Sequence, residues 1–515
     1  MSSAPDVIRA PRRAWAALGA LTLAVLILAI DGTVLALAVP SLTAELDATA
    51  TQVLWIGDIY SFALAGLLVT MGNVADRIGR KRLLLLGSAG FGLASLLAAF
   101  APTAELLIVA RALLGISGAT IMPSTLSIVR NLFENRTERA RAIAIWSAGA
   151  TGGAALGPLV GGALLEHFWW GSVFLINVPV VLLVLGFGAL LLPESRNPHA
   201  GRIDFTSALL SMVAIVPVVY AVKRVFGGDL DLAVAASASL GLAAGWIFLR
   251  RQRSLDTPLI DVALFRRPAF SGAVAANGLA IFAFSGLLYF FSQYLQLVRE
   301  YSPFEAGLRE LPATVASIAV IGLVGLILRR LGAGRAIGGG LAVAGLGLLV
   351  LAWGEGMEGY AAIGVALAVI GLGVGVAMTL STDAVVAAAP KERAGAASAI
   401  AETAYELGVA LGIAVLGALT TVFYRARLDL PAAADPDMAD AARESLPAAV
   451  HAIDPTAPGG SDTLGAAQAA FASGMQSTSI VAAVLLFVAA AIAWRVIPSG
   501  RSNIDSREVE EVRTA

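Results

Sequence analysis

Long apolar stretches recur along the whole chain of 515 residues, and they restrict the fold to a bundle of membrane-spanning helices. A helix needs about 20 apolar residues to cross a hydrocarbon core of about 30 Å, and it satisfies its own backbone polar groups there. Only 14% of the residues are charged, against about 25% in soluble domains. We therefore predict an all-α polytopic membrane protein. Its fourteen expected spans lie near residues 15–39, 53–73, 83–101, 104–127, 142–165, 172–192, 205–222, 232–249, 269–297, 305–328, 336–353, 360–384, 395–424 and 472–494.

The basic residues orient these spans. If both termini are cytoplasmic, 27 of the 35 Lys and Arg residues fall on the cytoplasmic side and seven on the other, with Arg111 inside a span. Loops on the cytoplasmic side of a membrane carry an excess of Lys and Arg. A missing or additional span would scramble this division, so the charges favour fourteen spans with both termini inside.

The composition excludes several kinds of site. The chain has no Cys, which rules out disulfides and thiolate ligands, and its three His are too scattered for a metal site. The net charge of −1 does not favour nucleic-acid binding. The sequence has no nucleotide-binding loop and no sizeable soluble module. We therefore expect no enzyme activity, no cofactor and no nucleic-acid partner.

Three short segments are echoed later in the chain at an offset of 253 to 255 residues. The segments starting at Gly72, Arg139 and Leu156 resemble those starting at Gly325, Arg393 and Leu411. Repeats of six helices are typical of alternating-access transporters, which bind substrate near mid-membrane between the halves. The expected division is an N-terminal six-helix bundle (1–203), inserted helices seven and eight with a linker (204–268), and a C-terminal six-helix bundle (269–515).

The longest stretch between spans, residues 428–470, is expected on the extracellular side. It is rich in Ala, Pro and acidic residues. One interpretation is an amphipathic helix near residues 437–450 that covers the outer mouth of a pathway. We favour the other interpretation, a solvated loop without fixed structure, because of the polar composition.

Asp31 lies inside the first apolar stretch. A carboxylate at mid-depth costs at least ~2.5 kcal/mol on insertion scales, so an acid there indicates a functional site. The alternative is a structural acid tied to a neighbouring helix by hydrogen bonds. Arg111, in the fourth span, is the base placed deepest within a helix, and a buried guanidinium also needs a partner or water.

Two motifs combine glycines with other residues of special conformation or charge. The segment Gly72-Asn-Val-Ala-Asp-Arg-Ile-Gly-Arg-Lys-Arg82 occupies the turn between the second and third spans, where Gly79 permits a tight turn. The alternative is that its bases only orient the chain. The segment Gly153-Ala-Ala-Leu-Gly-Pro-Leu-Val-Gly-Gly162 lies in the fifth span, where Pro frees backbone groups and small residues permit close packing.

These motifs resemble those of the major facilitator superfamily. The first resembles its cytoplasmic gate loop, in which the residues to consider are Gly72, Asp76, Arg77, Gly79 and Arg80. The second resembles the antiporter motif, with Gly153, Gly157, Pro158, Gly161 and Gly162. Further segments are similar to the fourteen-helix drug:proton antiporters, especially the branch that exports quaternary ammonium compounds: Leu28-Ala-Ile-Asp-Gly-Thr-Val, Trp55-Ile-Gly-Asp-Ile-Tyr-Ser61, Phe174-Leu-Ile-Asn-Val-Pro179 and Glu402-Thr-Ala-Tyr-Glu-Leu-Gly408.

The resemblance implies roles for the acids of the spans. It assigns proton coupling to Asp31, with Arg111 tuning its protonation, and to Asp58. The alternatives are a structural polar clamp for Arg111 and a solvated acid at the membrane edge for Asp58. Glu402 and Glu406 are four residues apart and share one helix face, where we expect them to attract a cationic substrate; hydrogen bonds to a neighbouring helix are the alternative. Aromatic side chains add cation–π attraction; the candidates are Trp55, Tyr60, Tyr289 and Tyr405.

The expected protein is a monomeric, proton-coupled antiporter in the cytoplasmic membrane of a bacterium. It would export lipophilic, cationic drugs such as quaternary ammonium compounds and dyes by alternating access. A dedicated exporter of one antibiotic or natural product is the main alternative. Proton-coupled uptake is disfavoured by the antiporter motif, and a non-transporting sensor is disfavoured by the acids and Arg111 within the spans.

Overall fold

The computed structural model describes residues 11–133, 135–196, 204–226, 230–255, 258, 260–357, 359–389, 394–432 and 434–499. All regular elements in these residues are helical. The first part comprises α1 (Arg12–Leu46), α2 (Ala50–Ile78), α3 (Arg80–Ala99), α4 (Ala104–Leu132), α5 (Arg136–His167), α6 (Ser172–Leu175) and α7 (Asn177–Leu191). Two helices follow, α8 (Phe205–Phe226) and α9 (Leu232–Ser254).

The second part begins with the 3₁₀ helix η1 (Val262–Arg266), α10 (Pro268–Gln293) and the π-helix η2 (Tyr294–Val298). It continues with α11 (Pro303–Ala319), α12 (Ile321–Leu331), α13 (Ala333–Glu355), α14 (Ala361–Ala388) and α15 (Ala394–Arg427). The short helices α16 (Pro436–Glu444) and α17 (Leu446–Ala452) precede the final helix, α18 (Gly460–Val496).

Twelve helices in the described residues are long and apolar enough to cross a membrane. A thirteenth span arises if α11 and α12, which meet at an angle of 50°, form one bent helix. The apolar part of α8, Thr206–Val222, is shorter than the others. The structure therefore confirms a polytopic helical bundle, while the number fourteen stays a prediction.

The two parts of the chain pair their helices in the same way. Helix α1 packs against α5 and α7, as α10 packs against α15 and α18. Likewise α2 packs against α4 as α11 does against α14, and α3 against α4 as α13 does against α14. The inserted helices α8 and α9 pack against each other, and α8 contacts both α2 and α15. We retain the division into two six-helix bundles, here called the N half and the C half, as a proposal.

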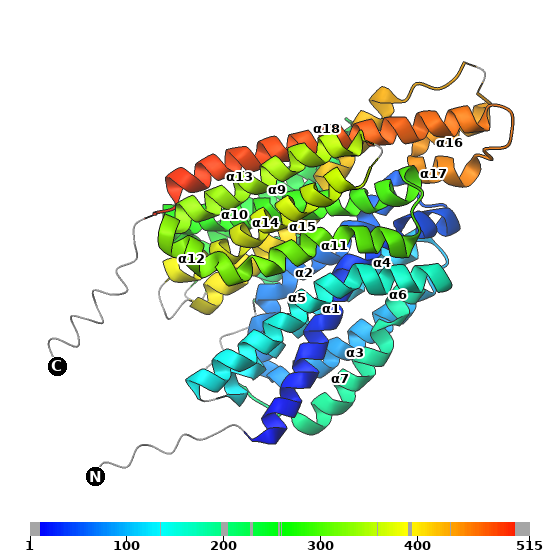
Figure 1. The fold of residues 1–515 in the computed structure, drawn as a ribbon. Helices are drawn as coiled ribbons and strands as arrows, with labels where there is room; N and C mark the ends of the chain where they lie inside the picture. The colour runs from blue at the N-terminus through cyan, green and yellow to red at the C-terminus, as the bar shows by residue number, and fades with distance from the viewer. Residues whose placement is uncertain are drawn as a thin grey trace, which may run out of the picture.

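The halves meet closely near one end of the bundle. Helix α1 begins and α18 ends at one end of the bundle, here called the terminal end. Helices α16 and α17 lie at the opposite end, here called the loop end (Figure 1). Toward the loop end, the Tyr289 hydroxyl donates to the Val53 carbonyl at 3.0 Å, and the Gln296 amide donates to the Leu37 carbonyl at 3.1 Å. These bonds join α10 and η2 of the C half to α2 and α1 of the N half.

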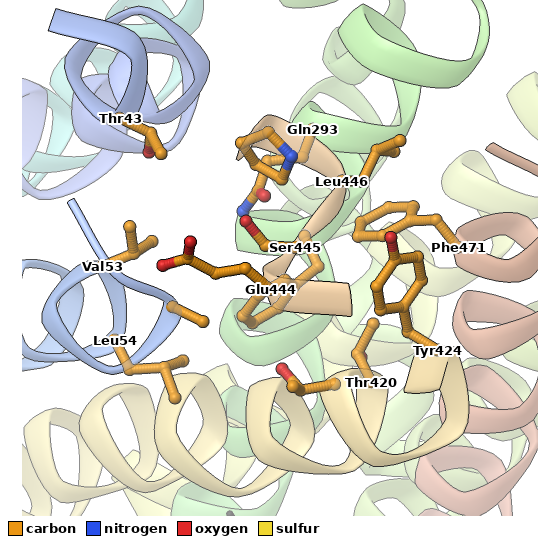
Figure 2. Close-up of a pocket in the computed structure, with 14 residues that line it drawn as sticks. Thr43, Val53, Leu54, Gln293, Thr420, Tyr424, Glu444, Ser445, Leu446 and Phe471 are labelled. Carbon is orange, nitrogen blue, oxygen red and sulfur yellow. The ribbon is translucent and has the colours of Figure 1, made fainter. Parts of the chain in front are cut away.

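Two short helices, α16 and α17, form within the segment 428–470, so the favoured interpretation of a solvated loop without fixed structure is wrong. Asp435 and Ser445 cap α16 and α17 by accepting backbone N–H bonds. Apolar residues of both helices are buried, and the Tyr424 hydroxyl donates to the Ala442 carbonyl. Figure 2 shows Glu444 reaching from the end of α16 toward Val53 of the N half, beside a pocket that Thr420 of the C half also lines. The two helices pack against the bundle because apolar side chains recur on one face of each. The overall composition of the segment does not reveal this pattern.

Candidate functional site

A buried ion pair joins α1 to α4. Arg111 Nη1 lies 2.8 Å from Asp31 Oδ2, and the two side chains are 2% and 0% exposed. Arg111 Nε also donates to the Ile56 carbonyl of α2 at 3.2 Å. A charge removed from water is tolerated when it is paired and hydrogen-bonded, and this arrangement satisfies both residues. The sequence singled out both side chains, and the fold brings them into contact.

Asn177, which was not among the predicted site residues, completes the environment of Asp31. Its Nδ2 donates to Asp31 Oδ1 at 2.9 Å and to Ser95 Oγ at 3.0 Å. Asn177 is completely buried, and its Oδ1 has no hydrogen-bond partner. Its position as an amide in an otherwise apolar helix is the sequence feature that could have indicated a site residue. Both carboxylate oxygens of Asp31 are therefore held, one by α4 and the other by α7.

Tyr60 lies beside this ion pair. The Arg111 guanidinium stands 4.7 Å from the centre of its ring. Gly115 of α4 permits this approach, because a Cβ there would lie 2.3 Å from the Tyr60 carbonyl oxygen. Tyr60 also interacts electrostatically with Asp31, Glu406 and Tyr405. Arg111 covers one face of the ring, and the expected role of Tyr60 in substrate binding stays a prediction.

The second group of charges lies on α15. Glu402, Tyr405 and Glu406 are half-buried, and Glu406 is hydrogen-bonded to the side chain of Ser61, the neighbour of Tyr60. The two carboxylates interact with each other. Two neighbouring carboxylates repel when both are ionised, so such a pair favours a shared proton or a bound cation. The fold thus brings Tyr60 close enough to interact with both the expected proton site, Asp31, and one of the expected cation-attracting acids, Glu406.

Other candidates line the loop-end half of α2. Asp58 is completely buried, so it is not a solvated acid at the membrane edge. Gly57 beside it faces the ring of Tyr289, which a Cβ would approach to 2.9 Å. Tyr289 is buried and bonded to Val53, whereas Trp55 is half-buried. Tyr289 therefore helps to join the halves at this end.

The glycine-rich motif of α5 packs directly around Asp31. A Cβ at Gly153 would lie 2.5 Å from the Leu26 carbonyl, at Gly157 1.9 Å from Thr33 Oγ1, and at Gly161 2.2 Å from Val34 Cγ2. These three contacts line up along α1 on both sides of Asp31. Gly162 instead faces Phe304 of α11, and the Pro158 carbonyl faces Gly307 of α11. One helix therefore contacts both the segment of α1 that carries Asp31 and the C half.

Comparison with known proteins identifies the family. The sequence model of the Major Facilitator Superfamily matches residues 21–413. The chain belongs to this superfamily. Members are membrane transporters, and the expectation that the protein is not an enzyme is in agreement with this assignment.

Superfamily relatives match most of the chain. It is 46% identical to the multidrug efflux pump LfrA of Mycolicibacterium smegmatis, over 95% of this chain and 97% of that protein. It is 41% identical to the methyl viologen resistance protein SmvA of Salmonella typhimurium, over 89% and 93% of the two chains. A tetracenomycin C resistance and export protein of Streptomyces glaucescens is 33% identical, over 79% and 76%.

One solved transporter structure has a fold similar to that of this chain. A bacterial homologue of the human lysosomal transporter Spinster, in an inward-facing and unoccupied conformation, has a TM-score of 0.66 and 18% identity. It covers 95% of this chain, and 98% of its own chain is covered. At this identity the similarity concerns the fold alone.

The segment expected to form a gate loop comprises the end of α2, Gly79 and the start of α3. Asp76 pairs with Arg80 at 2.7 Å, and Gly79 has φ +114°, which favours glycine. Gly72 faces Pro123 of α4, and Arg77 is exposed. Glu194, for which the sequence predicted no role, accepts the backbone N–H groups of Lys81 and Arg82 with its carboxylate. Glu194, which lies just after α7, thereby caps the start of α3. No local sequence pattern predicted this contact.

The packing of α5 on α1 predicts a difference between two adjacent glycines. Gly153→Ala should destabilise the protein by about 1–3 kcal/mol, because its Cβ would press on the Leu26 backbone and a packed helix pair would have to shift. Gly152→Ala should leave stability unchanged or slightly higher, because nothing lies within 4 Å of that Cβ. Thermal unfolding in detergent measures both variants. Equal melting temperatures would contradict this packing.

Proposed function

We propose that the protein is a proton-coupled antiporter that exports lipophilic cationic drugs. The observation that carries this proposal is the environment of Tyr60, which interacts both with the buried Asp31–Arg111 pair and with Glu406 and Tyr405. An exchanger of protons for cations needs a protonatable site and a cation site that influence each other. The relatives named as efflux and resistance proteins support export of small drugs.

The proposed proton and drug sites can compete although they share no residue. With Asp31 ionised, the pair with Arg111 has no net charge. Once Asp31 binds a proton, the uncompensated guanidinium gives the pair a charge of +1, and this charge acts on a cation held at Glu402 and Glu406. Interactions between charges are strong where water is scarce. Proton binding thus promotes drug release, and drug binding promotes proton release.

The proposed setting is the cytoplasmic membrane of a bacterium, with a monomer whose termini face the cytoplasm. The excess of basic residues on that side supports this orientation. The loop end then faces outward. The bonds from Tyr289 and Gln296 to the N half support an arrangement closed to the outside, from which a drug would enter from the cytoplasmic side.

The direct test is transport by the purified protein in proteoliposomes. A pH gradient, acidic on the side of the loop end, should drive ethidium to that side, and nigericin, which collapses the gradient, should stop it. Tetraphenylphosphonium should compete with ethidium. Absence of gradient-driven movement of either cation would contradict the proposal.

A dedicated exporter of one natural product is the second candidate, favoured by the similarity to the tetracenomycin C resistance and export protein. The higher identity to the multidrug pump LfrA favours the broader function. Transport of several unrelated cations in the same assay would exclude the dedicated exporter.

A further inference from the structure

Glu310 is a buried acid at the junction of the two halves that the proposed mechanism does not use. It is 3% exposed and lies seven residues from the start of α11, about 10 Å along the helix axis. One turn earlier, Gly307 lies against α5, where a Cβ would be 2.3 Å from the Pro158 carbonyl oxygen. Glu310 therefore lies one turn along α11 from the contact between α11 of the C half and α5 of the N half.

Among the described residues, Glu310 forms no ion pair. Its carboxyl interacts with the Ser292 side chain, whose Oγ accepts from Gln296 Nε2 at 3.2 Å. The same Gln296 amide bonds to the Leu37 carbonyl of the N half. Glu310 Oε1 is buried without a hydrogen-bond partner. The network thus runs from Glu310 across the junction to α1.

The nearby charged and titratable groups do not supply a counter-charge. Arg309 stacks on Tyr301 at 3.7 Å and lies 3.9 Å from the exposed Glu305, so its guanidinium is engaged elsewhere. The Tyr360 hydroxyl, which faces Glu310 from the start of α14, donates to the Arg309 carbonyl. Helix α5 has no charged residue between Arg141 and Glu166, and α10 has none at all.

A second buried acid differs in having a base nearby. Glu355, at the end of α13, is 4% exposed and interacts electrostatically with Arg299, although neither of its carboxylate oxygens has a hydrogen-bond partner. Glu310 has no such basic neighbour among the groups that act on it. Burying an ionised carboxylate without a counter-charge costs several kcal/mol, whereas a neutral acid can be buried with a few hydrogen bonds.

We propose that Glu310 is a second proton-binding site, which takes up a proton from the outer solution as the loop end closes and returns it to that side when α11 parts from α5. The direction rests on the proposed orientation. The proton on Glu310 does not cross the membrane in this scheme, because the closed junction separates it from the terminal end. It makes closure of the loop end dependent on the outside pH.

The sign of this dependence follows from proton linkage. The closed arrangement binds one proton at Glu310, and the open arrangement exposes the carboxyl to water, where it ionises at neutral pH. The state that binds more protons gains population as pH falls. The loop end should therefore close as the outer solution becomes more acidic, which is also the condition under which an inward proton gradient is largest.

The absence of native Cys permits a clean labelling test in the full-length protein. Val53→Cys places a thiol at the loop-end junction, where Val53 is 7% exposed, and Leu230→Cys places one between α8 and α9, where Leu230 is 82% exposed. Each variant is labelled from outside, in cells without drug, by a membrane-impermeant maleimide at pH 6 and pH 8. The rate for Val53→Cys is divided by that for Leu230→Cys, which corrects for the chemistry of the thiol.

With Glu310 present, we expect the corrected rate to fall at least threefold from pH 8 to pH 6. Glu310→Gln cannot ionise and should label slowly at both pH values, and Glu310→Leu should do the same if the amide variant folds poorly. Glu305→Gln, on the same helix but exposed and next to Arg309, should keep the native dependence. A pH dependence that survives in Glu310→Gln and Glu310→Leu, or that disappears in Glu305→Gln, would overturn the proposal.

The assay also separates this inference from the proposed function. Labelling requires neither a drug nor a gradient, so loss of ethidium transport with an intact pH dependence would refute drug export and leave the Glu310 site standing. Failure of Leu230→Cys to react from outside would refute the orientation, and with it the assignment of the proton to the outer solution.

Discussion

Asp31→Asn is expected to abolish coupling between the pH gradient and drug transport. Asparagine keeps the size of the side chain but cannot bind and release a proton. It also leaves the Arg111 charge uncompensated, which mimics the protonated pair and should weaken cation binding at Glu402 and Glu406. Ethidium transport in proteoliposomes should fall to the level without a gradient. Gradient-driven transport that is undiminished would remove Asp31 from the coupling mechanism.

Two further variants separate coupling from folding. Glu45→Gln changes an exposed acid on the same helix and should transport normally. Removing one partner of a buried ion pair costs about 3–5 kcal/mol, so Asp31→Asn should also melt at a lower temperature. Asp31→Asn combined with Arg111→Gln removes both charges and should recover part of the stability and the ethidium affinity, but not the coupling. Coupled transport by this double variant would contradict the proposed proton site.

Replacing both glutamates of α15 is expected to have the second large effect. Glu402→Gln with Glu406→Gln should lower the affinity for ethidium by at least tenfold, which corresponds to about 1.4 kcal/mol. The reason is the loss of the carboxylates that offset the cost of burying a cation. Fluorescence titration of the purified protein measures the affinity at constant pH.

The matched control is Asp383→Asn, an exposed acid near the terminal end of α14, which should bind ethidium as the native protein does. Each single glutamate variant should show a smaller loss than the double variant, because one carboxylate can still neutralise a monovalent cation. Unchanged ethidium affinity in the double variant would place the cation site elsewhere.

The difference between predictable and unpredictable site residues is physical. Asp31, Arg111, Glu402 and Glu406 were found from the sequence because a charge within a long apolar helix is costly wherever its partner lies. Asn177 lies in a segment that carries the family resemblance, but it has no charge, so no cost of burial marked it as a site residue. Glu310 follows Ser302 and Glu305, which form the capping box at the start of α11. In the sequence it therefore resembles an ordinary solvent-exposed acid near the start of a helix.

The sequence by itself determined the class of structure, the apolar helices and the acids that require an explanation, because these depend on the composition of single segments. The signature turn at Gly79 was also local. Only the tertiary structure decided which oxygen of Asp31 bonds to Arg111 and which bonds to Asn177. It also decided that α16 and α17 pack against each other and against α18. It alone showed Glu310 at the junction of α11 with α5. These features depend on contacts between helices far apart in the chain, and such contacts arise only when side chains of different helices pack into one bundle.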